Sequence, residues 1–107
     1  MKRLYLVSND KIWFSKKKFT SNNDLGNIVS CLYKNYKIHL LCRKSNKKLN
    51  FLIKNKSTYD ELININEKKI DLLLVSISPY NCFVIFYLIF FKKIKLRGFV
   101  YLRSDGF

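Results

Sequence analysis

The sequence predicts an α/β fold in which a parallel sheet is flanked by helices. Apolar runs at residues 4–7, 36–42, 70–77 and 99–102 have the length and composition of buried strands. Helical patterns at residues 25–33 and 80–91 lie between consecutive runs. A chain of 107 residues with 49% hydrophobic content can bury the core of one small domain. Strands that alternate with helices favour parallel pairing through right-handed crossovers.

The first half of the chain contains the clearest strand and helix signals. Lys2 and Arg3 open the run 4–7, and Ser8-Asn9-Asp10 close it, which predicts a buried first strand. Residues 11–19 combine aromatic residues with lysines and are interpreted as a loop. Apolar residues of the segment 25–33 follow the spacing i, i+3, i+4, i+7, i+8, which predicts a helix. The candidates for its N-cap are Ser21, Asn22 and Asn23.

In the second half, residues 49–53 and 59–65 each fit a short strand or a helical turn. The leucine-rich run 70–77 predicts a central strand that is buried on both faces. Ser78 followed by Pro79 is typical of an N-cap and the first helical position. The helix that they open, residues 80–91, is apolar almost all round.

The helix at 80–91 has two interpretations. Its uncharged run, residues 82–91, is half the length of about 20 residues that a membrane span needs. The favoured interpretation is a core helix packed between the sheet and neighbouring elements. The alternative is an interfacial helix anchored by the lysines that follow it, Lys92, Lys93 and Lys95.

Net charge of +14 and a pI of about 9.9 suggest an anionic partner, such as a nucleic acid, a nucleotide or an acidic lipid surface. About four lysines occur for every arginine, which an AT-rich genome would also produce, so the charge alone does not establish binding. Cys31, Cys42 and Cys82 form no CxxC pair and are predicted to be reduced, buried thiols of a cytosolic protein. His39 is the single histidine, so no metal site is expected.

The ligand edge of such a sheet consists of the loops that follow the carboxyl ends of its strands. Here these are residues 8–13, 76–80 and 103–105. The first loop contains no glycine, which argues against a dinucleotide dehydrogenase or a P-loop NTPase. A single histidine on a strand gives no support for Ser-His-Asp or Cys-His catalysis.

Four segments, together with the capped helix that follows a long first loop, resemble the N-terminal domain of a GT-B-fold glycosyltransferase, a Rossmann-like domain. The four segments are KRLYLVS at 2–8, KIHLLC at 37–42, IDLLLVS at 70–76 and VYLRSDG at 100–106. The resemblance covers almost the whole chain as a pattern. A glycine-rich first loop, common in this family, is replaced here by Ser8-Asn9-Asp10.

The resemblance implies that residues 1–107 form the acceptor-side domain of a two-domain enzyme and that this domain is incomplete at its C-terminus. A nucleotide-sugar donor would be held by a C-terminal domain that the chain lacks, and no cofactor is expected on this fragment. Asp105 is the implied catalytic base, with a turn residue before Gly106 as the alternative. The implied acceptor-binding residues are Ser8, Asn9, Asp10, Trp13, Ser78, Tyr80, Arg103 and Ser104.

The leading hypothesis is therefore a glycosyltransferase fragment that is inactive on its own. The enzyme would be cytoplasmic and would work at the inner membrane face, on a cell-envelope glycan or a lipid-linked acceptor. Peripheral contact with an anionic membrane is expected, and nucleic acid is not expected as a partner. The alternative is a stand-alone basic α/β module that binds nucleic acid or anionic lipid without catalysis.

Overall fold

The computed structural model describes residues 2–15, 18–49, 51–53, 58–59, 64–75 and 77–101, and these form an α/β domain with one mixed sheet. Its strands are β1 (Lys2–Ser15), β2 (Lys18–Ser21), β3 (Tyr36–Lys44), β4 (Phe51–Ile53), β5 (Thr58–Tyr59), β6 (Lys69–Leu74) and β7 (Lys95–Tyr101). Its helices are α1 (Asn23–Leu32) and α2 (Pro79–Phe86), and α2 continues into the π-helical turn η2 (Tyr87–Phe91). The α/β class predicted from the sequence is confirmed.

Five strands of the sheet are parallel, in the spatial order β5-β3-β1-β6-β7. β2 pairs antiparallel with the second half of β1, and β4 pairs antiparallel with β2. The neighbour of β1 is therefore β6 from Tyr5 to Val7 and β2 from Ile12 onward. The prediction of a purely parallel sheet is wrong for the antiparallel arm formed by β2, β4 and the second half of β1. The reason is that β1 continues to Ser15, well beyond the predicted run 4–7, and pairs with β2 as a hairpin.

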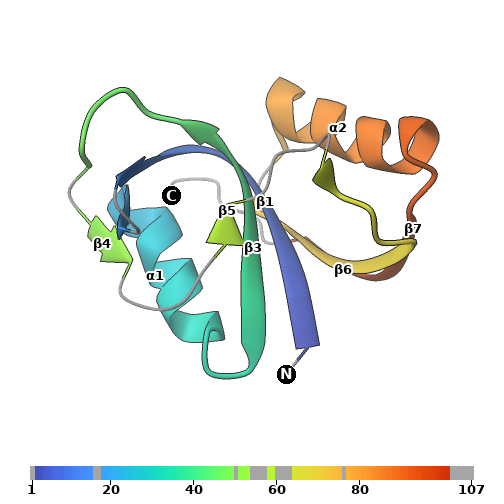
Figure 1. Cartoon of the computed structure of the whole chain (residues 1–107), viewed down its shortest axis with the longest axis horizontal. Coiled ribbons are helices and arrows are strands. Elements are labelled where there is room, and N and C mark those ends of the chain that lie inside the picture. Colours follow the sequence, from blue (N-terminus) through green and yellow to red (C-terminus); the bar gives the residue numbers. More distant parts are fainter. Residues whose placement is uncertain are drawn as a thin grey trace.

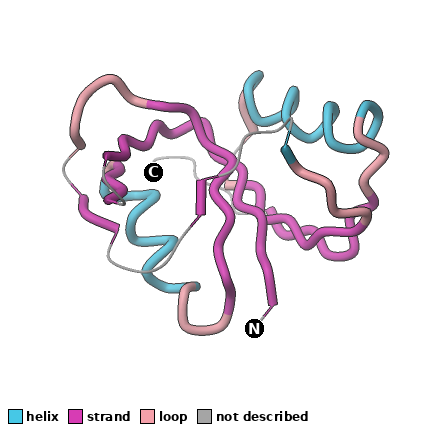
Figure 2. The backbone as a smooth tube through the Cα atoms, in the orientation of Figure 1, coloured by secondary structure: helices cyan, strands magenta, loops and turns pink. Residues whose placement is uncertain are grey.

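The two helices cover opposite faces of the sheet (Figures 1 and 2). Successive side chains of a strand point to opposite faces, and the core is divided accordingly. Leu4 and Leu6 of β1 belong to the cluster under α1, whereas Tyr5 and Val7 belong to the cluster under α2 and η2. β6 is buried on both faces, as its apolar run predicted.

Local signals placed both helix starts correctly. Asn22 caps α1, since its Oδ1 accepts the N–H of Leu25 at 2.8 Å. Ser78 caps α2, since its Oγ accepts the N–H of Asn81 at 3.1 Å, and Pro79 takes the first helical position. η2 ends where the N–H of Lys92 donates to the carbonyl of Tyr87 at 3.0 Å. Both caps satisfy a donor that the first turn leaves without a helical partner.

Two predictions about burial are wrong. Cys42 is buried, but Cys31 and Cys82 are exposed free thiols. The helix at 80–91 is not enclosed by core on all sides, because only one side of it packs on the sheet. Asn81, Val84 and Leu88 are buried, while Phe83, Phe86, Phe90 and Phe91 are exposed. The described helices include none that is both long enough and apolar enough to cross a membrane.

Candidate functional site

The candidate site lies where β1 and β6 part. The two strands run parallel from Tyr5 to Val7, and the N–H of Val75 donates to the carbonyl of Val7 at 3.1 Å. The chain leaves β1 through α1 toward β3, and it leaves β6 through α2 toward β7 on the other side. Parallel strands whose connections go in opposite directions create a crevice at their carboxyl ends, where α/β proteins bind ligands.

Residues 8–10 form an irregularity within β1 at this point. Val7 pairs with Leu41 and Lys11 pairs with Arg43, so β1 has two more residues than β3 over this stretch. Ser8 is fully buried, and its Oγ accepts the N–H of Asp10 at 3.1 Å and donates to Oδ2 of Asp10 at 3.0 Å. The prediction of an open loop at 8–13 is therefore wrong, because this bulge lets the strand continue to Ser15.

Two side chains of the bulge, those of Asn9 and Asp10, are accessible to solvent at least in part. Asn9 is exposed, and its Oδ1 accepts a long hydrogen bond of 3.5 Å from Nη1 of Arg43. Asp10 is half-buried beside Cys42. Burial raises the pKa of the Cys42 thiol and the Asp10 charge raises it further, so this thiol stays neutral and is a poor nucleophile. The bulge thus offers an amide, a carboxylate and a nearby guanidinium for hydrogen bonding.

Ser78 and Tyr80, both predicted to bind the acceptor, have structural roles. The Ser78 hydroxyl caps α2, and its carbonyl accepts the N–H of Cys82 at 2.9 Å. Tyr80 is half-buried and packs against the core cluster under α2. Because only four residues separate β6 from α2, both lie at the carboxyl edge of the sheet, and Figure 1 shows α2 starting beside the bend of β1.

Trp13 is not brought to this site. It pairs with Thr20 in the antiparallel arm and is half-exposed. It lies five positions farther along β1 than Ser8, which corresponds to about 16 Å in a fully extended strand. The remaining predicted residues, Arg103, Ser104 and Asp105, lie outside the described residues.

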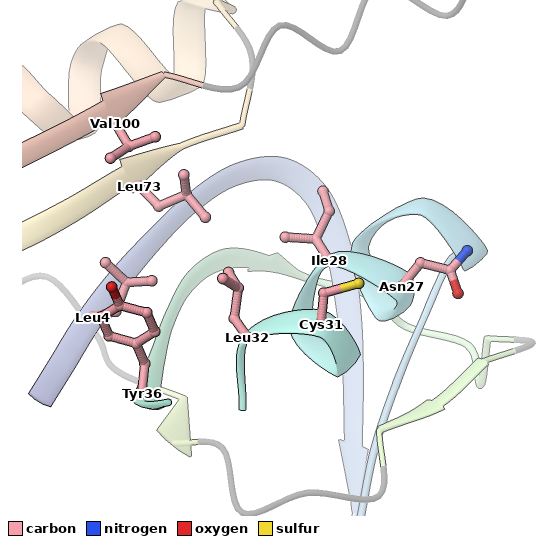
Figure 3. Close-up of a pocket in the computed structure, with 8 residues that line it drawn as sticks. All are labelled: Leu4, Asn27, Ile28, Cys31, Leu32, Tyr36, Leu73 and Val100. Carbon is pink, nitrogen blue, oxygen red and sulfur yellow. The ribbon is translucent and has the colours of Figure 1, made fainter. Parts of the chain in front are cut away.

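An apolar hollow of about 400 Å³ lies on the α1 face, away from the bulge (Figure 3). Its lining comes from α1, the start of β3 and strands β1, β6 and β7. The residues are Leu4, Asn27, Ile28, Cys31, Leu32, Tyr36, Leu73 and Val100. Asn27, the Cys31 thiol and the Tyr36 hydroxyl are its polar groups and the other lining side chains are apolar, so the hollow suits an apolar group better than a hydroxylated sugar.

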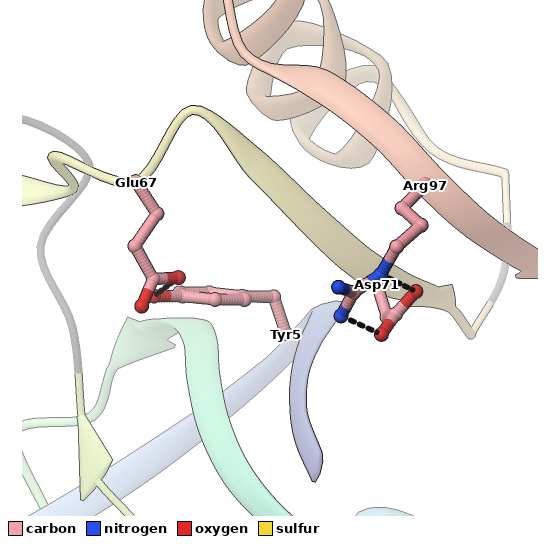
Figure 4. A network of polar contacts seen from close by, with 4 residues as sticks. All are labelled: Tyr5, Glu67, Asp71 and Arg97. Atoms are coloured by element: carbon pink, nitrogen blue, oxygen red, sulfur yellow. Dashed lines mark hydrogen bonds and ion pairs between the residues drawn. The ribbon is translucent and has the colours of Figure 1, made fainter.

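A polar network lies near the amino ends of the central strands (Figure 4). The Tyr5 hydroxyl donates to Oε2 of Glu67 at 2.6 Å, Arg3 pairs with the same carboxylate, and the Tyr5 ring stacks on His39. Arg97 binds Asp71 through Nε at 3.3 Å and Nη2 at 2.7 Å. No group of three potential metal ligands occurs among the residues that the structure describes.

This network predicts acid sensitivity. Burial alone would raise the pKa of Glu67, but hydrogen bonds from Tyr5 and Arg3 outweigh it and lower that pKa below 4.5. The Arg97 hydrogen bonds lower the pKa of Asp71 below 3.8. Each carboxylate therefore contributes its full stabilisation when the pH is above its ordinary pKa. That contribution is lost as the pH falls through the lower pKa that the group has in the folded protein.

Lowering the pH from about 6 to about 3 should therefore reduce the urea midpoint of the unmodified protein. The same change of pH should reduce the midpoint of E67Q/D71N by less. Chemical denaturation followed by circular dichroism at both pH values measures this difference. An equal fall in the two proteins would show that these carboxylates do not contribute to acid sensitivity.

Sequence reasoning missed Arg43, because its place beside Asn9 depends on the register between β1 and β3. It also missed the hollow, which needs five elements to be positioned together. The sequence matches no protein-family model, and comparisons with curated proteins and with solved structures found no significant match.

Proposed function

We propose that the chain is the Rossmann-like, acceptor-side domain of a glycosyltransferase with the GT-B fold. The observation that supports this best is the order of the parallel strands, β5-β3-β1-β6-β7. Numbered along the chain, these strands follow the order 3-2-1-4-5 of doubly wound domains. With α1 and α2 on opposite faces, this order favours ligand binding at the carboxyl ends of β1 and β6.

The accessible groups of the bulge suit a hydroxylated acceptor. Asp10 can accept hydrogen bonds from sugar hydroxyls, and Asn9 and Arg43 can donate to their oxygens. The hydrogen bonds between Ser8 and Asp10 hold the backbone of the bulge in place. This limits the conformational entropy that the binding side chains lose when a ligand binds. In this proposal Asp105 supplies the base, and the nucleotide-sugar donor is held by a second domain. The chain alone should then bind acceptors without turning over donors.

The test is a titration of the isotope-labelled 107-residue chain, monitored through its backbone amide resonances. Oligosaccharide acceptors and, separately, nucleotide sugars are added. Acceptors should shift the resonances of Asn9, Asp10 and Arg43, and nucleotide sugars should leave them unchanged. Shifts by nucleotide sugars alone, or by no sugar at all, would exclude an acceptor site at the bulge.

The substitution D10N sharpens this test. It keeps an oxygen for the Ser8 hydroxyl but removes the charge that strengthens hydrogen bonds to sugar hydroxyls. We expect acceptor affinity to fall about tenfold, which corresponds to ~1.4 kcal/mol. N35A is the control, because Asn35 is exposed in the turn before β3, at the opposite edge of the sheet. Equal affinities of D10N and N35A would contradict the role of Asp10.

A further inference from the structure

The outer side of α2 and η2 carries four exposed phenylalanines, here called the aromatic face. They are Phe83, Phe86, Phe90 and Phe91, with exposed fractions of 59%, 62%, 64% and 75%. The opposite side of the same helix supplies Val84 and Leu88, which are fully buried in the core. A helix this apolar on its outer side lacks the polar face that a solvent-exposed helix normally presents.

The aromatic rings contact one another along the helix. Phe86 and Phe90 have ring centroids 4.6 Å apart, and Tyr87 stacks on Phe91 at 5.0 Å. Phe99 and Tyr101 of β7 pair with Leu72 and Leu74, which belong to the core under α2. Phe99 and Tyr101 are also exposed, and their side chains lie on the side of the sheet that α2 covers.

Positive charge directly follows the aromatic face. Lys92, Lys93 and Lys95 come immediately after η2, and Lys93 and Lys95 are exposed. Residues 79–101 contain no acidic side chain. A partner that covers this surface must therefore accept aromatic rings, and the exposed Lys93 and Lys95 at their border favour an anionic one.

We propose that the aromatic face docks on an anionic lipid bilayer, with α2 and η2 lying in the plane of the membrane interface. The rings of Phe86 and Phe90 enter the boundary between headgroups and acyl chains. Lys92, Lys93 and Lys95 bind the anionic headgroups. Interfacial helices bury phenylalanines at the boundary between headgroups and acyl chains and bind anionic lipids through lysines. This proposal does not depend on the transferase function.

Two other occupants fit the surface less well. The 13 residues of α2 and η2 extend about 20 Å, which is less than the ~30 Å hydrocarbon core, so the helix lies on the membrane and does not cross it. A second copy docked symmetrically would add its own lysines to the interface, and residues 79–101 of that copy contain no acidic side chain to pair with them.

The test is sedimentation of the full chain with phosphatidylcholine vesicles that either contain or lack phosphatidylglycerol. Binding should require phosphatidylglycerol. K92E/K93E/K95E should weaken it by on the order of 100-fold, at about fivefold for each lysine. F86S/F90S should weaken it about tenfold or more, because both rings leave the lipid. The matched controls are K34E/K37E/K47E and Y33S/L52S, all at exposed positions away from this face.

A depth measurement provides a second test. The indole introduced by F90W, in a W13F background, should be quenched by lipids brominated near the headgroup. Absence of quenching, absence of binding to phosphatidylglycerol vesicles, or equal binding by F86S/F90S and Y33S/L52S would each overturn the proposal. A dimer that F86S/F90S converts to a monomer in sedimentation analysis would assign the face to a second copy and would also overturn it.

Discussion

Leu6→Ala is expected to lower the free energy of unfolding by about 3 to 5 kcal/mol. Leu6 lies in the first half of β1, pairs with Leu40 on one side and Leu73 on the other, and is fully buried under α1. Its removal leaves a cavity between strands that neighbouring strands hold in place. Because small domains have only about 5–15 kcal/mol of stability, this variant should be close to unfolding at room temperature.

Urea denaturation followed by circular dichroism measures the effect. Leu52→Ala is the matched control, because Leu52 is a strand leucine that is 44% exposed on β4. Its cost should be within about 1 kcal/mol. Similar midpoints for the two alanine variants would mean that β1 is not the centre of the core, and the assigned sheet order would then be wrong.

Local signals in the sequence were sufficient for the caps and for the strands with unbroken apolar runs. Asn22 and Ser78 cap their helices through a side chain and a backbone group three residues apart, so the sequence nearby contains all that is needed. The run at 70–77 predicted a strand buried on both faces because no polar residue other than Asp71 and Ser76 interrupts it. β6 confirms this prediction over Lys69–Leu74.

The length of β1 could not be predicted, because Ser8-Asn9-Asp10 has the composition of a turn. In the structure the Ser8 hydroxyl binds both the N–H and the carboxylate of Asp10, which lets the bulge remain within the strand. The following residues then pair with β2 in place of β6. Position in the sequence did not distinguish residues able to bind a ligand from residues with a structural role. The hydroxyls of Ser8 and Ser78 both accept backbone N–H groups, whereas Asn9 and Asp10 remain at least partly accessible.

The exposure of the phenylalanines of the aromatic face was not favoured by the sequence either, for a different reason, because an interfacial helix was only the alternative interpretation of residues 80–91. Helical periodicity reveals the buried side only when the opposite side is polar. Phe83, Phe86 and Phe90 are as apolar as Val84 and Leu88, so the pattern favoured a helix enclosed by the core. Only the packing of α2 on one face of the sheet shows that Val84 and Leu88 are buried while the phenylalanines are exposed.

Gly26→Ala is expected to lower the free energy of unfolding by about 1 to 3 kcal/mol, although alanine is the better helix former. A Cβ atom at this position of α1 would lie 2.2 Å from Cδ1 and 2.5 Å from Cγ of Phe51. Contact with Cγ means that the whole ring of Phe51 must move, and that ring packs against the core under α1. Gly26 therefore lets α1 approach β4 closely.

A double-mutant cycle isolates this contact. In the F51A background the ring is absent, so Gly26→Ala should be neutral or should stabilise the protein by up to about 1 kcal/mol through helix propensity. Ser30→Ala, at an exposed position of the same helix, is the control and should have little effect in either background. A Gly26→Ala cost that persists unchanged without the Phe51 ring would place its origin in the helix backbone, and the close packing of α1 on β4 would lose its support.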